Sequence, residues 1–275
     1  RELEISQAPS IELLLKGYKM FECKPVATPM ERTLTKLEGD DIAPDHGYMS
    51  IVGSFLYLAM VSRPDIAFAV HSLGKHMQAA GEDHWAAARR LLRYLQGTKD
   101  LTIKYTGNMD GLFELVGYAD SDYAGDLDNR RSTSGNFFCL SHGIDIARID
   151  WMSRQQDLVA KSSSEAELIS ADSATMTAVH LRQMLSDLGY EQKKATVIME
   201  DNQGCIAMSE NPVLHQRAKH MDVKYHFTRE KVESKEIILI YVPTAHQLAC
   251  RRNDRRHRLG ADHPVEPVQQ PRRHP

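Results

Sequence analysis

The fold is decided by residues 113–126, FELVGYADSDYAGD, in which an apolar run ends in several acidic side chains. The first six of these residues have the apolar and aromatic composition of a buried strand. Asp120 stands at the end of that predicted strand, and Asp122, two residues on, would share its face. An acid at such a place is often only a turn former or a helix cap. Its role therefore depends on what the rest of the chain brings next to it.

Acidic side chains stand at two comparable places further along the chain. Glu165 and Glu167 lie in the first turn of a long helix predicted over residues 163–188, and Asp201 follows a strand predicted over residues 196–199. Acids at strand ends and at a helix start can meet at one edge of a sheet. Carboxylates gathered in this way repel each other unless a cation lies between them, and their hard oxygen atoms suit Mg²⁺ or Mn²⁺. A metal site is thus one interpretation of the spacing, and ordinary caps and turns are the other.

The two glutamates of this helix cannot both face the sheet, because residues two apart are separated by about 200° around a helix. Ser162 and Glu165 fit the spacing of a capping box, in which two side chains satisfy backbone N–H groups at the helix start. Ser164 and Glu167 fit the same spacing. Helical geometry alone therefore leaves open which glutamate belongs to a metal site.

The remaining pattern divides the chain into two regions. Before residue 107 the apolar spacing is helical, and after it strands and helices alternate, which predicts a mixed α/β layer sheet. In the first region we expect helices near residues 11–18, 48–60, 65–78 and 83–95. In the second we expect strands at 113–118, 136–140, 144–151, 196–199 and 236–242, and helices at 163–188, after Asp201 and at 219–232.

The end of the chain, residues 250–275, differs from the rest in composition. It carries seven Arg against three acids and few large aliphatic side chains. Such a segment cannot bury enough apolar surface to offset its ordering entropy, so we expect it to be disordered. The net charge of −3 is therefore the sum of two unlike parts. Residues 250–275 carry +4 (7 − 3), and the rest of the chain carries −7 (−3 − 4). An acidic body does not indicate nucleic-acid binding, but a nuclease site is itself a cluster of acids.

Two broad classes of protein are disfavoured. The longest unbroken apolar run, Phe55–Val61, has seven residues, whereas a membrane-spanning helix needs about 20. The four cysteines include no Cys-x-x-Cys pair, which argues against a zinc knuckle and favours free thiols in a reducing compartment. The chain begins with Arg1 and shows no signal segment. We therefore expect a fragment of a larger protein that lies inside the cell, in the cytoplasm or the nucleus, with no membrane partner.

Several blocks of the chain are distinctive in their amino-acid sequence and in the order in which they occur. In the second region they are GYADSDYAGDLDNRRSTSGNFFCL, WMSRQQDLVAKSSSEAELISADSA, EDNQGCIAMSENPVLHQRAKHMDVKYHFTREKVES and YVPTAHQLA. In the first they are CKPVATPM, RPDIA and HWAAARRLLRYLQGT. The later blocks resemble the ribonuclease H domain of copia-type retrotransposon polyproteins, and the earlier ones resemble the segment that joins reverse transcriptase to it. The resemblance covers nearly all of residues 5–249.

The resemblance implies an architecture and three site residues. It implies a mostly helical reverse transcriptase connection remnant at residues 1–107 and a ribonuclease H-like domain at residues 108–249. That fold is a mixed five-stranded sheet with flanking helices. Asp120, Glu167 and Asp201 would be its catalytic, metal-binding acids, and Glu167 is preferred over Glu165 because the residues after it match the family's helix.

The resemblance also implies a reaction and partners. The reaction is hydrolysis of the RNA strand of an RNA–DNA hybrid by two-metal catalysis with Mg²⁺ or Mn²⁺. The hybrid would be held through its backbone and sensed through the RNA 2′-OH. The second partner would be the upstream polymerase domain of the same polyprotein. No Tyr-x-Asp-Asp motif occurs in the chain, so this chain itself is not expected to polymerise DNA.

The chain departs from the family pattern after YVPTAHQLA. The family continues with an aspartate, the fourth metal acid, whereas this chain has Cys250 followed by an Arg-rich run. A thiol is a poor ligand for a hard cation. We therefore expect weakened turnover with some divalent-cation binding retained.

Other functions stay open beside the impaired nuclease. One is a catalytically inactive nucleic-acid-binding or structural remnant of the polyprotein, and another is a DNA-cutting enzyme on the same fold. The basic box RAKHMDVKYHF, from Arg217, predicts a solvated helix face, with contact to hybrid phosphates as the alternative.

Overall fold

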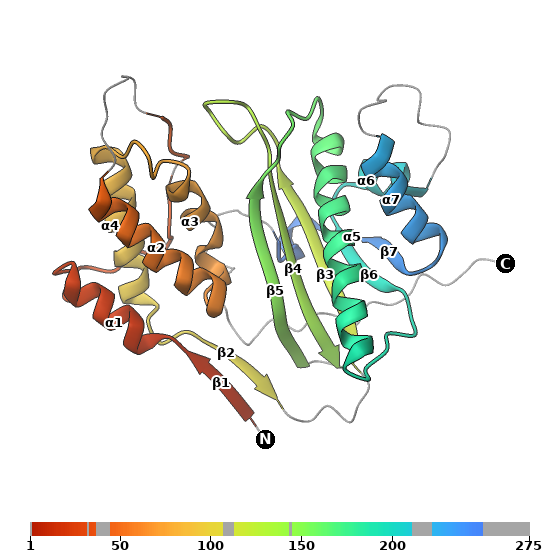
Figure 1. The fold of residues 1–275 in the computed structure, drawn as a ribbon, viewed down its shortest axis with the longest axis horizontal. Helices are drawn as coiled ribbons and strands as arrows, with labels where there is room; N and C mark the ends of the chain where they lie inside the picture. Colours follow the sequence, from red (N-terminus) through yellow and green to blue (C-terminus); the bar gives the residue numbers. More distant parts are fainter. Residues whose placement is uncertain are drawn as a thin grey trace.

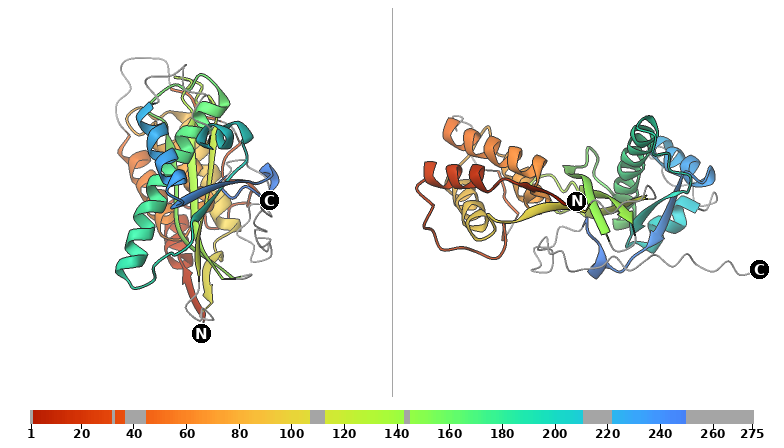
Figure 2. Two further views of the ribbon diagram at one scale, coloured as in Figure 1. Left: turned by 90° about the vertical axis from the view of Figure 1, so that its right-hand side faces the viewer. Right: turned by 90° about the horizontal axis from the view of Figure 1, so that it is seen from below.

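The computed structural model describes residues 2–31, 33–36, 45–106, 113–142, 145–210 and 222–249. These residues form a helical part and a part built on a five-stranded sheet. Figure 1 shows the helices of the first part on one side of the sheet and those of the second part on the other. The view from below in Figure 2 separates the same two groups of helices.

The first part is mostly helical, as its apolar spacing predicts. An antiparallel ribbon of β1 (Glu2–Ser6) and β2 (Thr102–Thr106) pairs its two ends. A single core lies between the helices, with Phe55, Leu73 and Leu91 fully buried in it. The helices are α1 (Ala8–Gly17), α2 (His46–Val61), the short η1 (Pro64–Ile66), α3 (Ala67–Gly74) and α4 (Glu82–Gly97).

A buried ion pair fixes the break between α2 and α3. The Arg63 side chain is fully buried, and its Nη2 atom lies 2.7 Å from Oδ2 of Asp65. The same guanidinium donates to the carbonyl of Thr98, just after α4, at 3.1 Å. The hydroxyl of Tyr94 donates to the Asp65 carboxylate at 2.9 Å. Because removing one partner of such a pair leaves an uncompensated buried charge, at a cost of about 3–5 kcal/mol, the sequence Arg-Pro-Asp has a structural role here.

The second part is built on a mixed sheet with the strand order β5-β4-β3-β6-β7. Strands β3, β4 and β5 are antiparallel neighbours, whereas β6 pairs with β3 in parallel and β7 with β6 in parallel. This arrangement confirms the predicted five-stranded mixed sheet. The strands are β3 (Glu114–Asp122), β4 (Thr133–His142), β5 (Asp145–Gln155), β6 (Thr196–Glu200) and β7 (Ile237–Tyr241).

The long helix α5 (Ser163–Asp187) covers one face of this sheet, with α6 (Gln203–Glu210) and α7 (Asp222–Glu233) packed beside it (Figure 1). The helix ends before Gly189, whose φ of 86° is the left-handed conformation that glycine adopts at a helix end. Its buried face is lined by alanines, which pack against Phe138 and Ile198 of the sheet. A smaller apolar cluster around Tyr118 and Phe137 lies on the other face.

The two parts contact each other along β5, an edge strand of the sheet. The indole Nε1 of Trp151 on β5 donates to the carbonyl of Ala59 in α2 at 2.7 Å. The Nζ atom of Lys75, just after α3, lies 2.6 Å from a carboxylate oxygen of Asp126 in the loop between β3 and β4. Helix α3 and strand β2 therefore lie against an edge whose backbone groups would otherwise be exposed.

The separate cores of the two parts support a division into domains. We propose boundaries at residues 1–107 and 108–249, because one apolar cluster lies wholly in the first range and the other two lie wholly in the second.

Several elements differ from the prediction. The β1–β2 ribbon was not predicted, because β1 has only five residues and is mostly exposed, although Leu3 and Ile5 alternate with polar residues in it. The helix expected over residues 65–78 is divided into η1 and a shorter α3, since Pro64 starts a separate turn. Strand β3 continues to Asp122, so Asp120 lies within the strand rather than at its end.

Other predictions fall on residues that the structure does not describe. These are the tail, residues 250–275, the start of the helix expected from residue 219, and the side chains of the basic box before His226. None of the helices in the described ranges combines the length and the apolar character needed to cross a membrane.

Candidate metal centre

Asp120 is held between a strand partner and a helix. Within β3 it pairs with Gly135 of β4. The hydroxyl of Ser170 on α5 donates to the backbone carbonyl of Asp120 at 2.7 Å. The Asp120 residue is only 7% exposed. The sheet and α5 thus fix the place from which its carboxylate projects.

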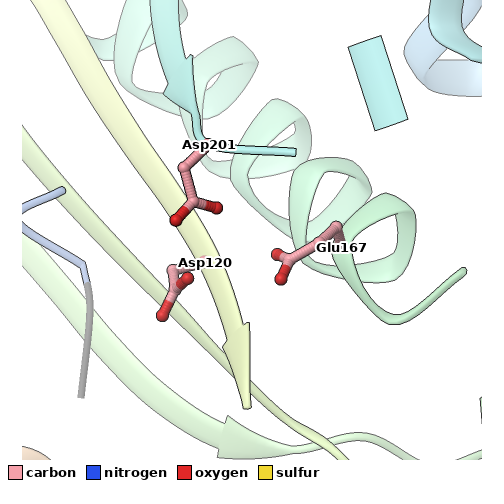
Figure 3. A group of neighbouring side chains, drawn as sticks. All are labelled: Asp120, Glu167 and Asp201. Atoms are coloured by element: carbon pink, nitrogen blue, oxygen red, sulfur yellow. The ribbon is translucent and has the colours of Figure 1, made fainter. Parts of the chain in front are cut away.

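The first turn of α5 separates the two glutamates that the sequence leaves as alternatives. The Ser162 hydroxyl accepts the N–H of Glu165 at 3.2 Å, and the Glu165 carboxylate accepts the N–H of Lys161 at 2.8 Å. Glu165 therefore serves the start of the helix. Glu167 is 6% exposed and points toward Asp120 (Figure 3).

Asp201 stands directly after β6, where the chain turns into α6. Its neighbour Asn202 accepts the N–H of Cys205 at 3.0 Å, which caps the start of α6. The hydroxyl of Thr244, in the short helix η4 (Thr244–His246), donates to Oδ2 of Asp201 at 2.6 Å. The half-buried Asp201 is thus fixed by its own turn and by a residue far along the chain.

These three acids form a cluster at the end of the sheet. Asp120, Glu167 and Asp201 each offer a carboxylate oxygen, and the three atoms lie within 4.8 Å of one another (Figure 3). The side chains come from β3, α5 and the end of β6, three segments far apart in the sequence. The structure therefore brings together the three residues proposed as ligands and leaves Asp122 and Glu165 outside that group.

A further buried acid, Glu200, which the sequence analysis did not single out, lies close to the cluster. Glu200 is fully buried, and its Oε1 atom accepts the N–H of Asn202 at 3.1 Å. The alternation of β6 contains a signal for it, because Ile198 and Glu200 share a strand face and Ile198 is also fully buried. Thr244 and Gln247 lie in the block YVPTAHQLA, and the sequence pattern predicts no role for either of them.

Burial and mutual repulsion raise the pKa values of two of these acids. Burial raises the pKa of Glu167 to about 8, and the nearby charges of Asp120 and Asp201 add to the shift. Burial raises the pKa of Glu200 to about 10, with a further contribution from Glu167. In the absence of a cation, the folded chain therefore holds protons here at neutral pH.

The carboxylate oxygens of the cluster fit a hard divalent cation. The Oε2 atoms of Glu167 and Glu200 are buried and have no hydrogen-bond partner among the described residues. Carboxylate oxygens from three segments are the ligands that Mg²⁺ and Mn²⁺ prefer. Cys250, the position of the expected fourth acid, lies outside the described residues. Of the other cysteines, Cys23, Cys139 and Cys205 are free thiols, as the sequence predicts.

The raised pKa of Glu167 predicts a pH dependence of stability. An acid whose pKa rises from 4.5 to about 8 on folding keeps its proton in the folded state while the unfolded state loses it. Stability therefore falls as the pH rises through that interval. Without divalent cations, Glu167→Gln should exceed the wild type in unfolding free energy by at least about 1 kcal/mol at pH 8, and the gain should shrink toward pH 4.5.

Urea unfolding of the two proteins across this pH range makes the measurement. Glu165→Gln, the same change two residues away, is the control and should show no such gain, because Glu165 caps the helix. Equal stability of Glu167→Gln and the wild type at every pH would contradict the prediction.

Comparison with known proteins places the chain among transposon proteins, although no family model matches it. The retrovirus-related Pol polyprotein from transposon TNT 1-94 of Nicotiana tabacum is 37% identical over 252 residues, 89% of this chain and 18% of that protein. The polyprotein from transposon RE2 of Arabidopsis thaliana is 38% identical over 250 residues, 90% of this chain and 17% of that protein. Secreted RxLR effector protein 161 of Plasmopara viticola is 43% identical over 134 residues, 49% of this chain and 90% of that protein.

Some solved structures resemble this chain at low similarity. The N-terminal ribonuclease H domain of a Mycobacterium tuberculosis protein has a TM-score of 0.34 at 13% identity, covering 53% of this chain and 94% of that one. The foamy viral protease-reverse transcriptase in complex with an RNA/DNA hybrid has a TM-score of 0.40 at 11% identity, covering 72% of this chain and 24% of that one.

The chain spans less than a fifth of the length of the transposon polyproteins that it matches. Within that span the identity extends over about nine-tenths of this chain. The mixed five-stranded sheet with flanking helices is the ribonuclease H-like fold that the sequence predicts. The chain is therefore homologous, over about nine-tenths of its length, to part of the retrovirus-related Pol polyproteins of plant retrotransposons, and it has a ribonuclease H-like fold.

Proposed function

We propose that this chain is the ribonuclease H of a copia-type retrotransposon polyprotein, an endonuclease that hydrolyses the RNA strand of RNA–DNA hybrids. One observation carries the proposal. Carboxylates of Asp120, Glu167 and Asp201 lie within 4.8 Å of one another in a chain of the Pol family. Such a cluster is costly to the fold, since like charges repel at this range, and a cation-dependent activity accounts for it.

Asp120, Glu167 and Asp201 would hold the divalent cations, which we propose to be Mg²⁺ in a two-metal arrangement. When bound, such ions activate a water molecule and stabilise the leaving oxygen of a phosphodiester. The role of the protein is then to hold three acidic groups in fixed places. The backbone contact of Ser170 with Asp120 and the hydroxyl contact of Thr244 with Asp201 serve this role.

The proposed partners are an RNA–DNA hybrid and the polymerase domain upstream in the same polyprotein. The first rests on the family, with recognition through the RNA 2′-OH and the backbone phosphates. The second agrees with the surface of the helical part, where Leu13, Tyr57 and Met60 are 74%, 59% and 76% exposed. Exposed large apolar side chains on neighbouring helices are typical of contact with another domain.

Cleavage of a labelled hybrid tests the proposed activity. In Mg²⁺ the chain should cleave the RNA strand and leave duplex DNA intact. Asp120→Asn should lower the rate by about 100-fold or more, because a metal ligand supports several kcal/mol of charge stabilisation. Asp122→Asn is the matched control, since Asp122 lies on the same strand outside the acid group, and it should stay within about twofold of the wild type.

Hybrid cleavage that survives Asp120→Asn would show that this acid group is not the catalytic site. Preferential cleavage of duplex DNA would favour the DNA-cutting alternative.

The cysteine at position 250, where the family has an aspartate, predicts a slow cleavage rate. Ala249, the residue before it, has its carbonyl oxygen 2.8 Å from where a Cβ of Gly135 would stand, and Gly135 is the strand partner of Asp120. We propose that Cys250 weakens turnover because a thiol is a poor ligand for a hard cation. Cys250→Asp should raise the rate of hybrid cleavage by about 10-fold, equivalent to ~1.4 kcal/mol in activation free energy.

Cys250→Ser is the control for size and should not raise the rate. Equal rates of the wild type and Cys250→Asp would show that the thiol is not what limits turnover. If neither protein cleaves the hybrid, the chain is the catalytically inactive remnant.

A further inference from the structure

The chain after β7 returns to the acid cluster and contacts both strands that carry it. This closing segment, Pro243–Ala249, contains η4 and the buried residue Gln247, which is 0% exposed. The Gln247 amide Nε2 donates to the carbonyl of Ala119 at 2.7 Å and to the carbonyl of Met199 at 3.2 Å. Ala119 precedes Asp120 on β3, and Met199 is the second residue before Asp201 on β6.

The Gln247 amide lies where β3 and β6 stop pairing. The parallel ladder between these strands ends at the pair Tyr118 and Met199. Beyond that pair, each strand leads directly into an acid of the cluster. A primary amide has two N–H donors, and here one amide group links the two strands at the point where the ladder no longer does. The side chain of Gln247 therefore joins the two strands just before they lead into the cluster.

Thr244 acts on the orientation of Asp201. The terminal torsion of an aspartate is broad, so a partly exposed carboxylate rotates unless a contact fixes it. The Thr244 hydroxyl donates to Oδ2 of Asp201 at 2.6 Å, which restrains the rotation of that carboxylate.

The end of the segment is fitted closely to the strand pair at Asp120. The N–H of Ala249 donates to Oε1 of Gln247 at 3.3 Å, so all polar atoms of that side chain are used. The carbonyl oxygen of Ala249 lies 2.8 Å from the place that a Cβ of Gly135 would occupy. Because a side chain there would collide with backbone, a glycine opposite Asp120 is what allows the close approach.

We propose that the closing segment positions the metal-binding acids, with Gln247 setting the spacing of β3 and β6 and Thr244 orienting the Asp201 carboxylate. Both are positioning residues, because Thr244 donates to the Asp201 carboxylate and Gln247 donates to backbone carbonyls close to Asp120 and Asp201. The proposal deepens the function proposed above and rests on it, since it takes the acid cluster to be a cation site.

Binding of Mn²⁺ to the full chain tests this role without relying on activity. The free ion can be followed by its electron paramagnetic resonance signal during titration, and thermal unfolding without metal reports on the fold. Thr244→Val removes the hydroxyl but keeps the size, and it should weaken Mn²⁺ binding by about 10-fold or more, as loss of a ligand's hydrogen-bond partner does. Its metal-free melting temperature should match that of the wild type, and Thr244→Ser should restore the affinity.

Gln247→Met removes both donors and should weaken Mn²⁺ binding by at least about 10-fold as well as lower the melting temperature. Gln192→Met is the matched control. Gln192 also ties β3 to a loop, accepting the N–H of Leu115 at 2.9 Å and donating to Tyr190 at 3.2 Å, but at the opposite end of the strand. It should lower stability and leave Mn²⁺ affinity unchanged.

The other outcomes overturn the proposal in distinguishable ways. If Asp120→Asn abolishes Mn²⁺ binding while Thr244→Val and Gln247→Met bind as the wild type does, the cation site stands and the positioning role falls. The same holds if Thr244→Ser fails to restore affinity, or if Gln192→Met weakens binding as much as Gln247→Met. If the wild type and Asp120→Asn show the same absence of binding, the cation site falls, and the positioning role falls with it.

Discussion

Electrostatic repulsion among buried carboxylates is the constraint on which the rest of this structure depends. Asp120, Glu167 and Asp201 each place a carboxylate oxygen within 4.8 Å of the other two, and Glu200 is buried close to them. Two unit charges 4 Å apart repel by about 4 kcal/mol at the effective dielectric of a protein surface. Without a cation the folded chain reduces this cost by keeping protons, which is why the pKa values of Glu167 and Glu200 are raised. The remainder of the fold has to hold these groups where they would not gather by themselves.

Strands and helices from distant parts of the chain hold the acids together. β3 is paired on both sides, to β4 and to β6, and α5 lies across it with Ser170 bonded to the carbonyl of Asp120. The helical first part braces the edge strand β5 through Trp151. The segment after β7 contacts the strands that lead into the cluster and the Asp201 carboxylate. Each acid therefore stands on an element that is fixed on more than one side, which is the arrangement that a preorganised metal centre requires.

The sequence predicts those features that arise from local patterns. The strand before Asp120, the helix that carries Glu167 and the strand before Asp201 all follow from apolar periodicity, and the family resemblance assigns the three acids. Spacing alone could not choose between Glu165 and Glu167, because both fit a capping box. The structure decides because Ser162 has the extended backbone of an N-cap, with φ −150° and ψ 162°, and bonds to Glu165.

Features that depend on distant contacts escaped sequence reasoning. Gln247 bonds to a carbonyl 128 residues away, and Thr244 bonds to an acid 43 residues away, so no local spacing reveals either role. The β1–β2 ribbon escaped for a different reason, since β1 is stabilised by pairing with β2 rather than by an apolar face.

The central claim, that the fold gathers Asp120, Glu167 and Asp201 in order to bind a divalent cation, is tested most directly by crystals soaked in Mn²⁺. Anomalous scattering locates this ion independently of any assay. The account predicts an anomalous peak among the three carboxylates that disappears in crystals of Asp120→Asn. Well-ordered acids with no peak between them, or a peak that persists in that variant, would contradict it.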